Sequence, residues 1–406
     1  MSASSPFSVR SFRFQWSADL ATSWAFEMEA LILGWYVLEA TGSVKQLVLV
    51  AALVWLGSLF SPFFGVLGDR VGVRTLMCVT RGVYALLAAT LAALALSGAL
   101  VPWHVFAIAA LSGLLRPSDM AMRNALVGQT MPARLLLRAI GISRTTTDTA
   151  RIAGALTGTA GVALVGMGPA YAAVAAMYVA AFLLTFGAAG APPRKRATAH
   201  PLTDLLEGFV YVWRKPELLG AVAMAFLTNL LAYPFILGLL PYVANHVFAA
   251  GQAGLGYLAA TYSAGALAGS LLVGSSRLPL RAARAMLWSA LLWFATILMF
   301  GQTASLSTGL ALLFFMGFFQ SFCMTPLAVL MLRSSSEAMR GRVMGVRQLA
   351  VWGLPLGLLA SGYLIERFDY VATTVIYSSL GLAATLAIAY GWRHALWHRS
   401  AQANVR

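Results

Sequence analysis

The sequence predicts an all-α integral membrane protein with about twelve transmembrane helices. Of its 406 residues, 60% are hydrophobic and 10% are charged, whereas soluble domains are about 45–50% apolar and about 25% charged. Apolar runs of about twenty residues recur along the whole chain, and each can cross about 30 Å of hydrocarbon at 1.5 Å per residue. Basic residues gather in alternate connections between these runs, which is typical of multi-pass membrane proteins.

The expected helices follow the apolar runs, with boundaries good to about two to four residues. They span residues 18–40, 46–67, 75–97, 103–126, 139–164, 169–190, 218–244, 254–274, 284–302, 308–332, 343–364 and 370–391. The first run holds Asp19, Glu27 and Glu29 and lacks a small-residue cleavage site, so we do not interpret it as a signal peptide. Cys78 and Cys323 both lie in apolar stretches, so neither a disulfide nor a thiolate metal site is expected.

The distribution of basic residues predicts the orientation in the membrane. One set of connections contains Arg70, Arg74, Arg134, Arg138, Arg194, Lys195, Arg196, Arg214, Lys215, Arg277, Arg281, Arg333, Arg340 and Arg342. The alternate connections hold only Lys45 and Arg367. The positive-inside rule therefore places both termini and the central loop in the cytoplasm, for a multi-pass protein of the cell (inner) membrane. The net charge of +15 is then a topology signal, and no nucleic-acid partner is expected.

The longest connection divides the chain into two halves of six helices, over residues 1–190 and 218–406. Within the connection, at 191–217, apolar residues recur at the spacing of one helical stripe, namely Leu202, Leu205, Leu206, Phe209 and Trp213. We expect a short amphipathic helix lying in the membrane interface. The alternative is a plain linker helix that only tethers the halves.

An internal repeat relates the two halves. GDRVGVR at 68–74 matches SSRLPLR at 275–281, and RAIGI at 138–142 matches RVMGV at 342–346. Both matches keep the same register across an offset of six helices. Two similar halves, related by pseudo-two-fold symmetry around a central site, are the architecture expected for alternating-access transport.

The segment FGVLGDRVGVR at 64–74 resembles the signature loop of the major facilitator superfamily, and its motif positions are Gly65, Asp69, Arg70, Gly72 and Arg74. The resemblance implies a secondary transporter whose loop acts as a gating latch; the alternative is that these charges only anchor the topology. The end of the first helix, LGWYVLEATGS, resembles the branch that holds the enterobactin exporter and drug:proton antiporters. Val73 departs from the signature, and the fifth helix lacks the Gly-Pro pair of the antiporter motif.

Ionisable residues inside the membrane are costly and mark candidate sites. Helical spacing puts three of them on one face of the fourth helix and three on one face of the fifth, and these are Arg116, Asp119, Arg123, Arg144, Asp148 and Arg151. The resemblance implies that both faces line the central cavity, where they would bind substrate. The alternative is a structural ladder of ion pairs that joins the two helices. The two interpretations are compatible.

The first helix adds two carboxylates that lie 200° apart, Glu27 and Glu29, so only one of them faces the cavity. The depth of Glu27 matches that of Arg116 and Arg151. Glu27 is either a proton carrier or the partner of a neighbouring arginine. Arg81 on the third helix is interpreted as an anchor at the cytoplasmic end.

The second half lacks these charges. Its candidate polar residues are Asn229, Gln320 and Gln348, which accompany aromatic residues such as Tyr233 and Trp352. A site that is charged on one wall and aromatic on the other suits an amphipathic organic solute.

The motifs argue against an enzyme. No His-x-x-x-His pair, phosphate-binding Gly-Lys-Ser loop or G-x-S-x-G elbow occurs, so we expect neither ATP coupling nor a cofactor or metal. The leading hypothesis is a monomeric, proton-coupled exporter of small amphipathic compounds of the drug or siderophore type. The alternatives are an importer or facilitator of a small metabolite, and a membrane sensor or assembly subunit that does not transport.

The topology can be checked by labelling. Arg196→Cys lies in the central loop, so a membrane-impermeant maleimide should modify it in inside-out vesicles and not in intact cells. Labelling of this cysteine from outside intact cells would overturn the predicted orientation.

Overall fold

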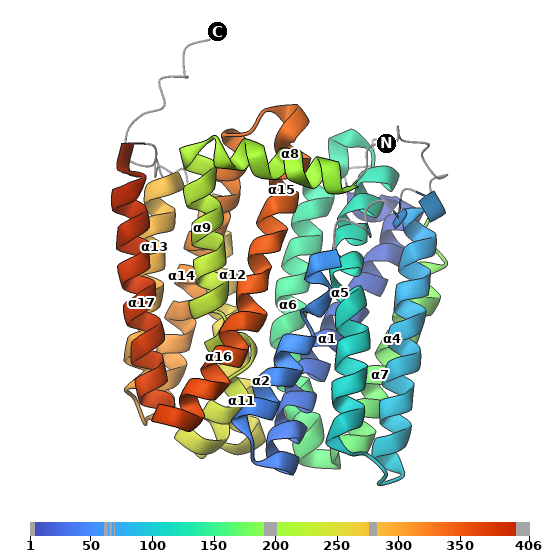
Figure 1. Ribbon diagram of the computed structural model, residues 1–406. Helices are drawn as coiled ribbons and strands as arrows, with labels where there is room; N and C mark the ends of the chain where they lie inside the picture. The colour runs from blue at the N-terminus through green and yellow to red at the C-terminus, as the bar shows by residue number, and fades with distance from the viewer. Residues whose placement is uncertain are drawn as a thin grey trace. The chain divides into compact units, whose positions relative to one another are not determined.

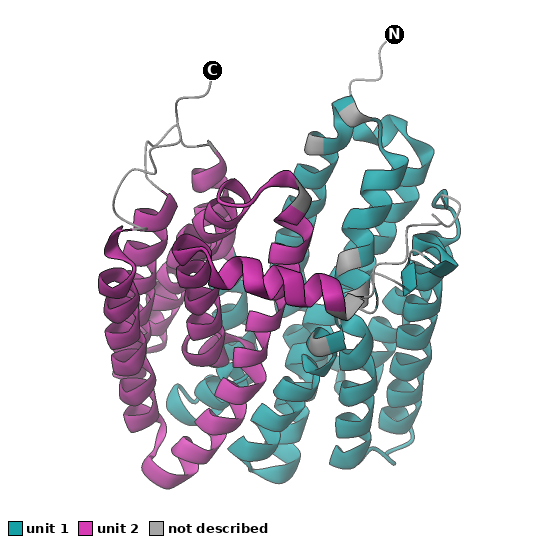
Figure 2. Cartoon of the chain, turned by 45° about the horizontal axis from the view of Figure 1, so that its top comes forward, with its two compact units in different colours: residues 1–198, 238–263 teal, residues 199–237, 264–406 magenta. Residues whose placement is uncertain are grey.

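The computed structural model describes residues 5–60, 64, 67–68, 70–190, 201–275 and 282–394. Their secondary structure is helical, with no strand among them. The chain forms two compact units, residues 1–198 with 238–263 and residues 199–237 with 264–406 (Figure 2).

Unit 1 is built around the first helix. Its helices are α1 (Arg10–Thr41), α2 (Val44–Leu53), α4 (Val73–Leu96), α5 (Pro102–Thr130), α6 (Ala133–Val165), α7 (Met167–Thr185) and the short α11 (Leu240–Tyr242). Helix α1 contacts α6, α7, α5 and α2, while α4 packs along α5 and α7 (Figure 1). Apolar side chains such as Ile32, Leu91 and Val174 form its buried core.

Unit 2 holds the remaining helices. They are α8 (Pro201–Trp213), α9 (Pro216–Leu231), α10 (Pro234–Leu237), α13 (Ala282–Gly301), α14 (Leu306–Arg333), α15 (Arg340–Leu349), α16 (Gly353–Phe368) and α17 (Tyr370–Gly391). Helix α12 (Gly251–Ser275) is divided between the units. Helix α13 packs between α14 and α17, and α9 contacts α16 and α17.

The helices confirm the predicted all-α membrane fold. Eight helices among the described residues are long and apolar enough to cross a membrane, and two apolar helices are shorter. Helices α1 and α6 also have the length to cross, because they contain 32 and 33 residues. With α15 and α16 counted as one crossing, the described chain supplies about twelve, as the sequence predicts.

Three predicted helices are interrupted. The span at 46–67 ends as α2 at Leu53 and continues as a 3-10 turn at Leu56–Phe60, where Gly57 allows the chain to approach the α5 backbone. The span at 218–244 breaks after α9 because Pro234 and Pro241 cannot donate a backbone hydrogen bond. A 3-10 turn at Ala350–Trp352 separates α15 from α16.

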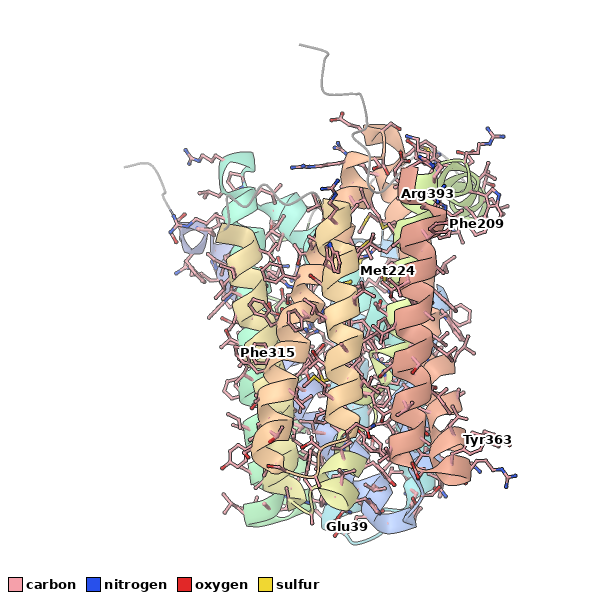
Figure 3. All side chains as sticks on the ribbon, turned by 90° about the vertical axis from the view of Figure 1, so that its left-hand side faces the viewer. Glu39, Phe209, Met224, Phe315, Tyr363 and Arg393 are labelled. Atoms are coloured by element: carbon pink, nitrogen blue, oxygen red, sulfur yellow. The ribbon has the colours of Figure 1, made fainter. Side chains whose placement is uncertain are left out.

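Helix α8 confirms the helix predicted in the central connection. It lies across the helix ends of unit 2, and Phe209 is at the same end of this unit as Arg393 while Tyr363 is at the other (Figures 1 and 3). Leu206, Phe209 and Trp213 of the predicted apolar stripe are exposed. The opposite edge of the helix packs on α15, where Gly208 leaves room for the Arg342 backbone.

Polar contacts fix α8 to α15 and to the segment that precedes it. The Arg342 guanidinium lies 2.6 Å from the Asp204 carboxylate and 3.0 Å from that of Glu207. The Ser336 amide donates to the Tyr211 hydroxyl oxygen at 3.1 Å. The Lys215 ammonium stacks over the Tyr211 ring, at 4.6 Å. Hydrogen bonding from Lys215 and from the Ser336 amide lowers the pKa of Tyr211 from 10.0 to about 8.

This contact should depend on pH. Since the pKa of Tyr211 is lower in the docked state, docking gains stability as the pH rises from about 8 to about 10 and loses it as the pH falls through 8. The difference between ultraviolet titrations of the wild type and Tyr211→Phe should show one phenol ionising near pH 8. Lys215→Met should move this ionisation upward; an unchanged midpoint would show that Lys215 does not stabilise the phenolate.

Candidate functional site

The signature loop is only partly described. Gly65 and Asp69 lie outside the described residues. Gly72 precedes α4 with a φ of 90°, a left-handed conformation that glycine adopts without strain. Arg70 is exposed, and Arg74 donates from Nη2 to the Phe186 carbonyl at the end of α7, at 2.5 Å.

Charged side chains from three helices meet inside unit 1, in a group that we call the buried charge network: Asp19 of α1, Arg81 of α4, and Asp119 and Arg123 of α5. Arg81 Nε lies 3.1 Å from Asp119 Oδ1, and its Nη2 contacts Asp19. Arg123 lies 2.6 Å from Asp119 Oδ2 and 3.7 Å from Asp19 Oδ1. Two arginines thus offset two aspartates, as burial of charge requires.

Neutral hydroxyl acceptors add to this network. Arg81 Nη1 donates to Thr185 of α7 at 2.8 Å, and Arg123 Nη1 donates to Ser23 of α1 at 2.6 Å. The Arg81 side chain is fully buried. Its interpretation as an end anchor is therefore wrong: eight residues of α4, about 12 Å of rise, separate Arg81 from the helix start.

A second charged group contains exposed and partly exposed side chains, and we call it the polar face: Glu27 of α1 with Arg144, Arg151 and the buried Asp148 of α6. Arg151 Nε lies 3.2 Å from Glu27 Oε1, and Asp148 lies within 3.7 Å of Arg151 and 3.4 Å of Arg144. The side chains of Arg151 and Glu27 are 39% and 27% exposed. Glu27 therefore has an arginine partner, and both side chains of the pair are partly exposed.

Close approach of α1 and α6 positions this pair. A Cβ at Gly154 would lie 2.7 Å from the Glu27 Cβ, and one at Gly158 would lie 2.8 Å from the Met28 Cα. Small residues at this spacing let membrane helices approach closely. The Trp24 indole donates to Thr157 on α6 at 2.8 Å, which adds a fixed contact beside the glycines.

The expected single ladder between the fourth and fifth helices is divided. Asp119 and Arg123 turn toward α1 and α4, whereas the described pairs of Asp148 stay on α6. Arg116 joins neither group, because its guanidinium lies over the rings of Phe26 and Trp55, at 4.6 and 5.1 Å. Asp119 and Arg123 share one face of α5, and Arg144, Asp148 and Arg151 share one face of α6. The rotation of each helix decides which other helix that face meets.

Glu29 lies apart from Glu27, as their 200° separation requires. Both of its carboxylate oxygens accept hydrogen bonds of 2.6 Å, from the hydroxyls of Tyr171 and Tyr178 on α7. Glu27 is thus the carboxylate that shares a surface with the arginines of α6. The tyrosines stand seven residues apart on α7, but nothing in the sequence marks them as partners of Glu29.

The predicted polar residues of the second half are half-buried in unit 2. Gln320 Nε2 donates to the Tyr233 hydroxyl at 2.9 Å, and the Tyr233 ring meets Trp293 edge-on at 5.2 Å. Asn229 donates to the Ala225 carbonyl of its own helix at 2.8 Å. Gln348 lies on α15. The structure thus joins Gln320 to Tyr233, which the sequence analysis names beside it, and adds Trp293, which it does not.

Among the described residues, no group of three or more His, Cys, Asp or Glu side chains could hold a metal ion. The polar face offers instead an accessible carboxylate paired with arginine, between long membrane helices. Ionisable side chains inside apolar helices are costly and mark candidate functional sites.

The comparisons with known proteins define the family. The Major Facilitator Superfamily profile matches residues 17–278, and the chain belongs to this superfamily. It is a transporter, not an enzyme. No curated protein matches the sequence.

Solved structures share the fold at low identity. The chain is similar to the nucleoside transporter NupG, with 13% identity and a TM-score of 0.73 over 96% of this chain and 100% of that one. It is similar to the human organic anion transporter MFSD10 (TETRAN), with 16% identity and a TM-score of 0.68 over 93% and 99%. A D-xylose-proton symporter gives 12% identity and a TM-score of 0.71 over 93% and 96%.

The two charged groups should respond differently to loss of a carboxylate. Asp119→Asn leaves Arg81 and Arg123 buried with one aspartate, and breaking a buried pair costs about 3–5 kcal/mol. Asp148→Asn should cost less, because the Arg144 and Arg151 side chains are 69% and 39% exposed and Arg151 keeps Glu27. Thermal unfolding in detergent measures both. Equal losses would contradict the division into a buried network and an accessible face.

Proposed function

We propose that this transporter exports small amphipathic organic compounds in exchange for protons, by alternating access. The polar face of unit 1 is the substrate and proton site. The observation that carries the proposal is the partly exposed ion pair between Glu27 and Arg151. A charged pair in the membrane is costly, and its accessibility is consistent with a working site more than with a structural bond.

Competition at Glu27 provides the coupling. Ionised Glu27 can hold a cationic or hydrogen-bond-donating end of a solute beside Asp148, whereas protonated Glu27 cannot hold a cation. Since proton and solute exclude one another, each crosses the membrane in the opposite direction. Arg151 holds the carboxylate in place while no solute is bound.

The buried charge network has a separate role in this proposal. It holds α1, α4 and α5 together as one body, so that the polar face keeps its geometry while the transporter changes state. The signature loop, with Gly65, Asp69, Arg70, Gly72 and Arg74, acts as the gating latch. In unit 2, the half-buried Asn229, Gln320 and Gln348 are the proposed substrate-binding residues.

The proposed setting follows from the basic loops. The protein is a monomer in the cell (inner) membrane, with both termini and residues 191–217 in the cytoplasm. Asp204, Glu207 and Arg342 then meet on the cytoplasmic side, and the apolar stripe of α8 lies in the membrane interface.

Import of a small metabolite is the alternative within transport. An organic anion that pairs with Arg151 would displace Glu27, and the released carboxylate would then take up a proton. Solute and proton would bind together and move in the same direction. The charge of the transported solute therefore distinguishes the two functions.

The test uses the full-length protein in proteoliposomes that contain a pH-sensitive dye, with ethidium as the amphipathic cation. Ethidium should drive proton movement in the opposite direction. Glu27→Gln should lower this proton flux by about tenfold or more and weaken ethidium binding, because an amide neither titrates nor carries the negative charge that holds a cation. Glu39→Gln, on the same helix and bonded to the Trp35 indole, is the matched control and should transport normally.

Two results would contradict the proposal. Full proton coupling in Glu27→Gln would show that the proton site lies elsewhere. Uptake of benzoate together with protons, with no response to ethidium, would establish the import alternative.

A further inference from the structure

An apolar groove lies on the outside of unit 1, between α4 and α7. Its volume is about 400 Å³, and its walls include Cys78, Val79 and Leu86 of α4 and Phe182 and Phe186 of α7. Val79 and Leu86 are 58% and 67% exposed, so the groove opens at the surface of the chain.

A glycine forms the floor of this groove. A Cβ at Gly82 would lie 3.1 Å from the Phe182 ring, so a larger residue would fill the space beside that ring. The groove runs from Thr75 to Leu86, which is about 16 Å along the helix. This is about half of a hydrocarbon core of about 30 Å, and therefore the depth of one leaflet.

The apolar walls alone do not select a ligand, because lipid chains in the surrounding membrane are equally apolar. Selection requires a polar contact at the end of the groove. Arg74 directly precedes Thr75 and provides it: its guanidinium donates to the Phe186 carbonyl at 2.5 Å. Gly190 leaves room for the Arg74 side chain, since a Cβ there would lie 3.2 Å from its Cδ. The cation is thus fixed at the mouth of the groove.

A second cation lies near the same end of α7. Phe14 fills the space over Gly187, one residue beyond Phe186, and the Arg10 guanidinium lies 5.7 Å from the centre of the Phe14 ring. Arginine carries five N–H donors in a planar fork that matches phosphate oxygens. A basic mouth on an apolar groove at membrane depth matches the two parts of a phospholipid.

We propose that the groove between α4 and α7 binds one phospholipid, with an acyl chain along Gly82 and the phosphate at Arg74. Arg10 adds to the positive field at the headgroup. The site is separate from the polar face, which contains no residue of the groove. Through this site, the position of the beginning of α4, and of the loop that precedes it, would depend on the lipid composition of that leaflet.

Cys78 supplies a direct readout, because it is half-buried in the groove wall while Cys323 is fully buried. The full-length protein is delipidated in detergent and titrated with phosphatidylglycerol, and the rate of Cys78 modification by N-ethylmaleimide is measured. Bound lipid should slow this reaction by about fivefold or more. Diacylglycerol, which has the chains without the phosphate, should protect only at a concentration at least tenfold higher.

Two arginine variants distinguish binding at this groove from nonspecific attraction of anionic lipid to positive charge. Arg74→Gln should raise the phosphatidylglycerol concentration for half-protection by about tenfold or more, because it removes a charge-assisted bond to phosphate. Arg70→Gln removes the same charge from an exposed position and is the matched control, with less than a twofold effect. Arg74→Lys keeps the charge without the planar fork and should give an intermediate shift. This variant replaces Arg74→Gln in the test if Arg74→Gln does not fold.

Three outcomes would overturn the proposal: no protection by phosphatidylglycerol, equal protection by diacylglycerol, or equal shifts for Arg70→Gln and Arg74→Gln. Because the assay measures labelling and not transport, its result is independent of the proposed proton coupling.

Discussion

The helix packing of unit 1 depends on one buried arginine, Arg81, whose charge must be paired because it is shielded from water. Arg81 has no exposed surface, so the carboxylates of Asp19 and Asp119 must come from two other helices to meet it. Each helix can satisfy this requirement in only one rotation. The ion pairs therefore fix how α1, α4 and α5 face each other, which apolar contacts in lipid do only weakly.

The rotation of α1 has a consequence on its other faces. With Asp19 turned to Arg81, Glu27 lies against α6 and Glu29 lies against α7. Three carboxylates on one helix thus have three different surroundings: a buried pair of arginines, an accessible arginine, and two tyrosine hydroxyls. Only the second of these is open enough to meet a solute, which is why the proposed site rests on Glu27.

Unit 2 uses different chemistry for the same structural task. Its helices approach through glycines: a Cβ at Gly353 would lie 2.7 Å from the Phe226 carbonyl oxygen. Its polar contacts include the neutral pair of Gln320 and Tyr233, and ion pairs join α8 to α15 and Glu337 to Arg340. The charges that the sequence places in the first half are thus concentrated in unit 1, where the proposed proton chemistry requires them.

The sequence alone predicted which segments are helices and about how many cross the membrane. The length of an apolar run is a local property, and it can be compared directly with the thickness of the hydrocarbon core. It also placed Asp119 with Arg123, and Asp148 with Arg151, on common faces, because helical periodicity is local. The signature at 64–74 identified the superfamily for the same reason. The sequence also contains Pro234 and Pro241, which interrupt the helix, although the predicted span at 218–244 continued through both.

Only the tertiary structure decided which faces meet. Arg81, Asp19 and the two tyrosines at Glu29 are isolated polar residues in apolar segments, and their partners lie more than sixty residues away in three of the four contacts. Rotation of a membrane helix is set by its neighbours and not by its own sequence pattern. The groove at Gly82 has the same origin, since it exists only where α4 and α7 pack side by side. Periodicity specifies a face, whereas the partner of that face is a property of the whole fold.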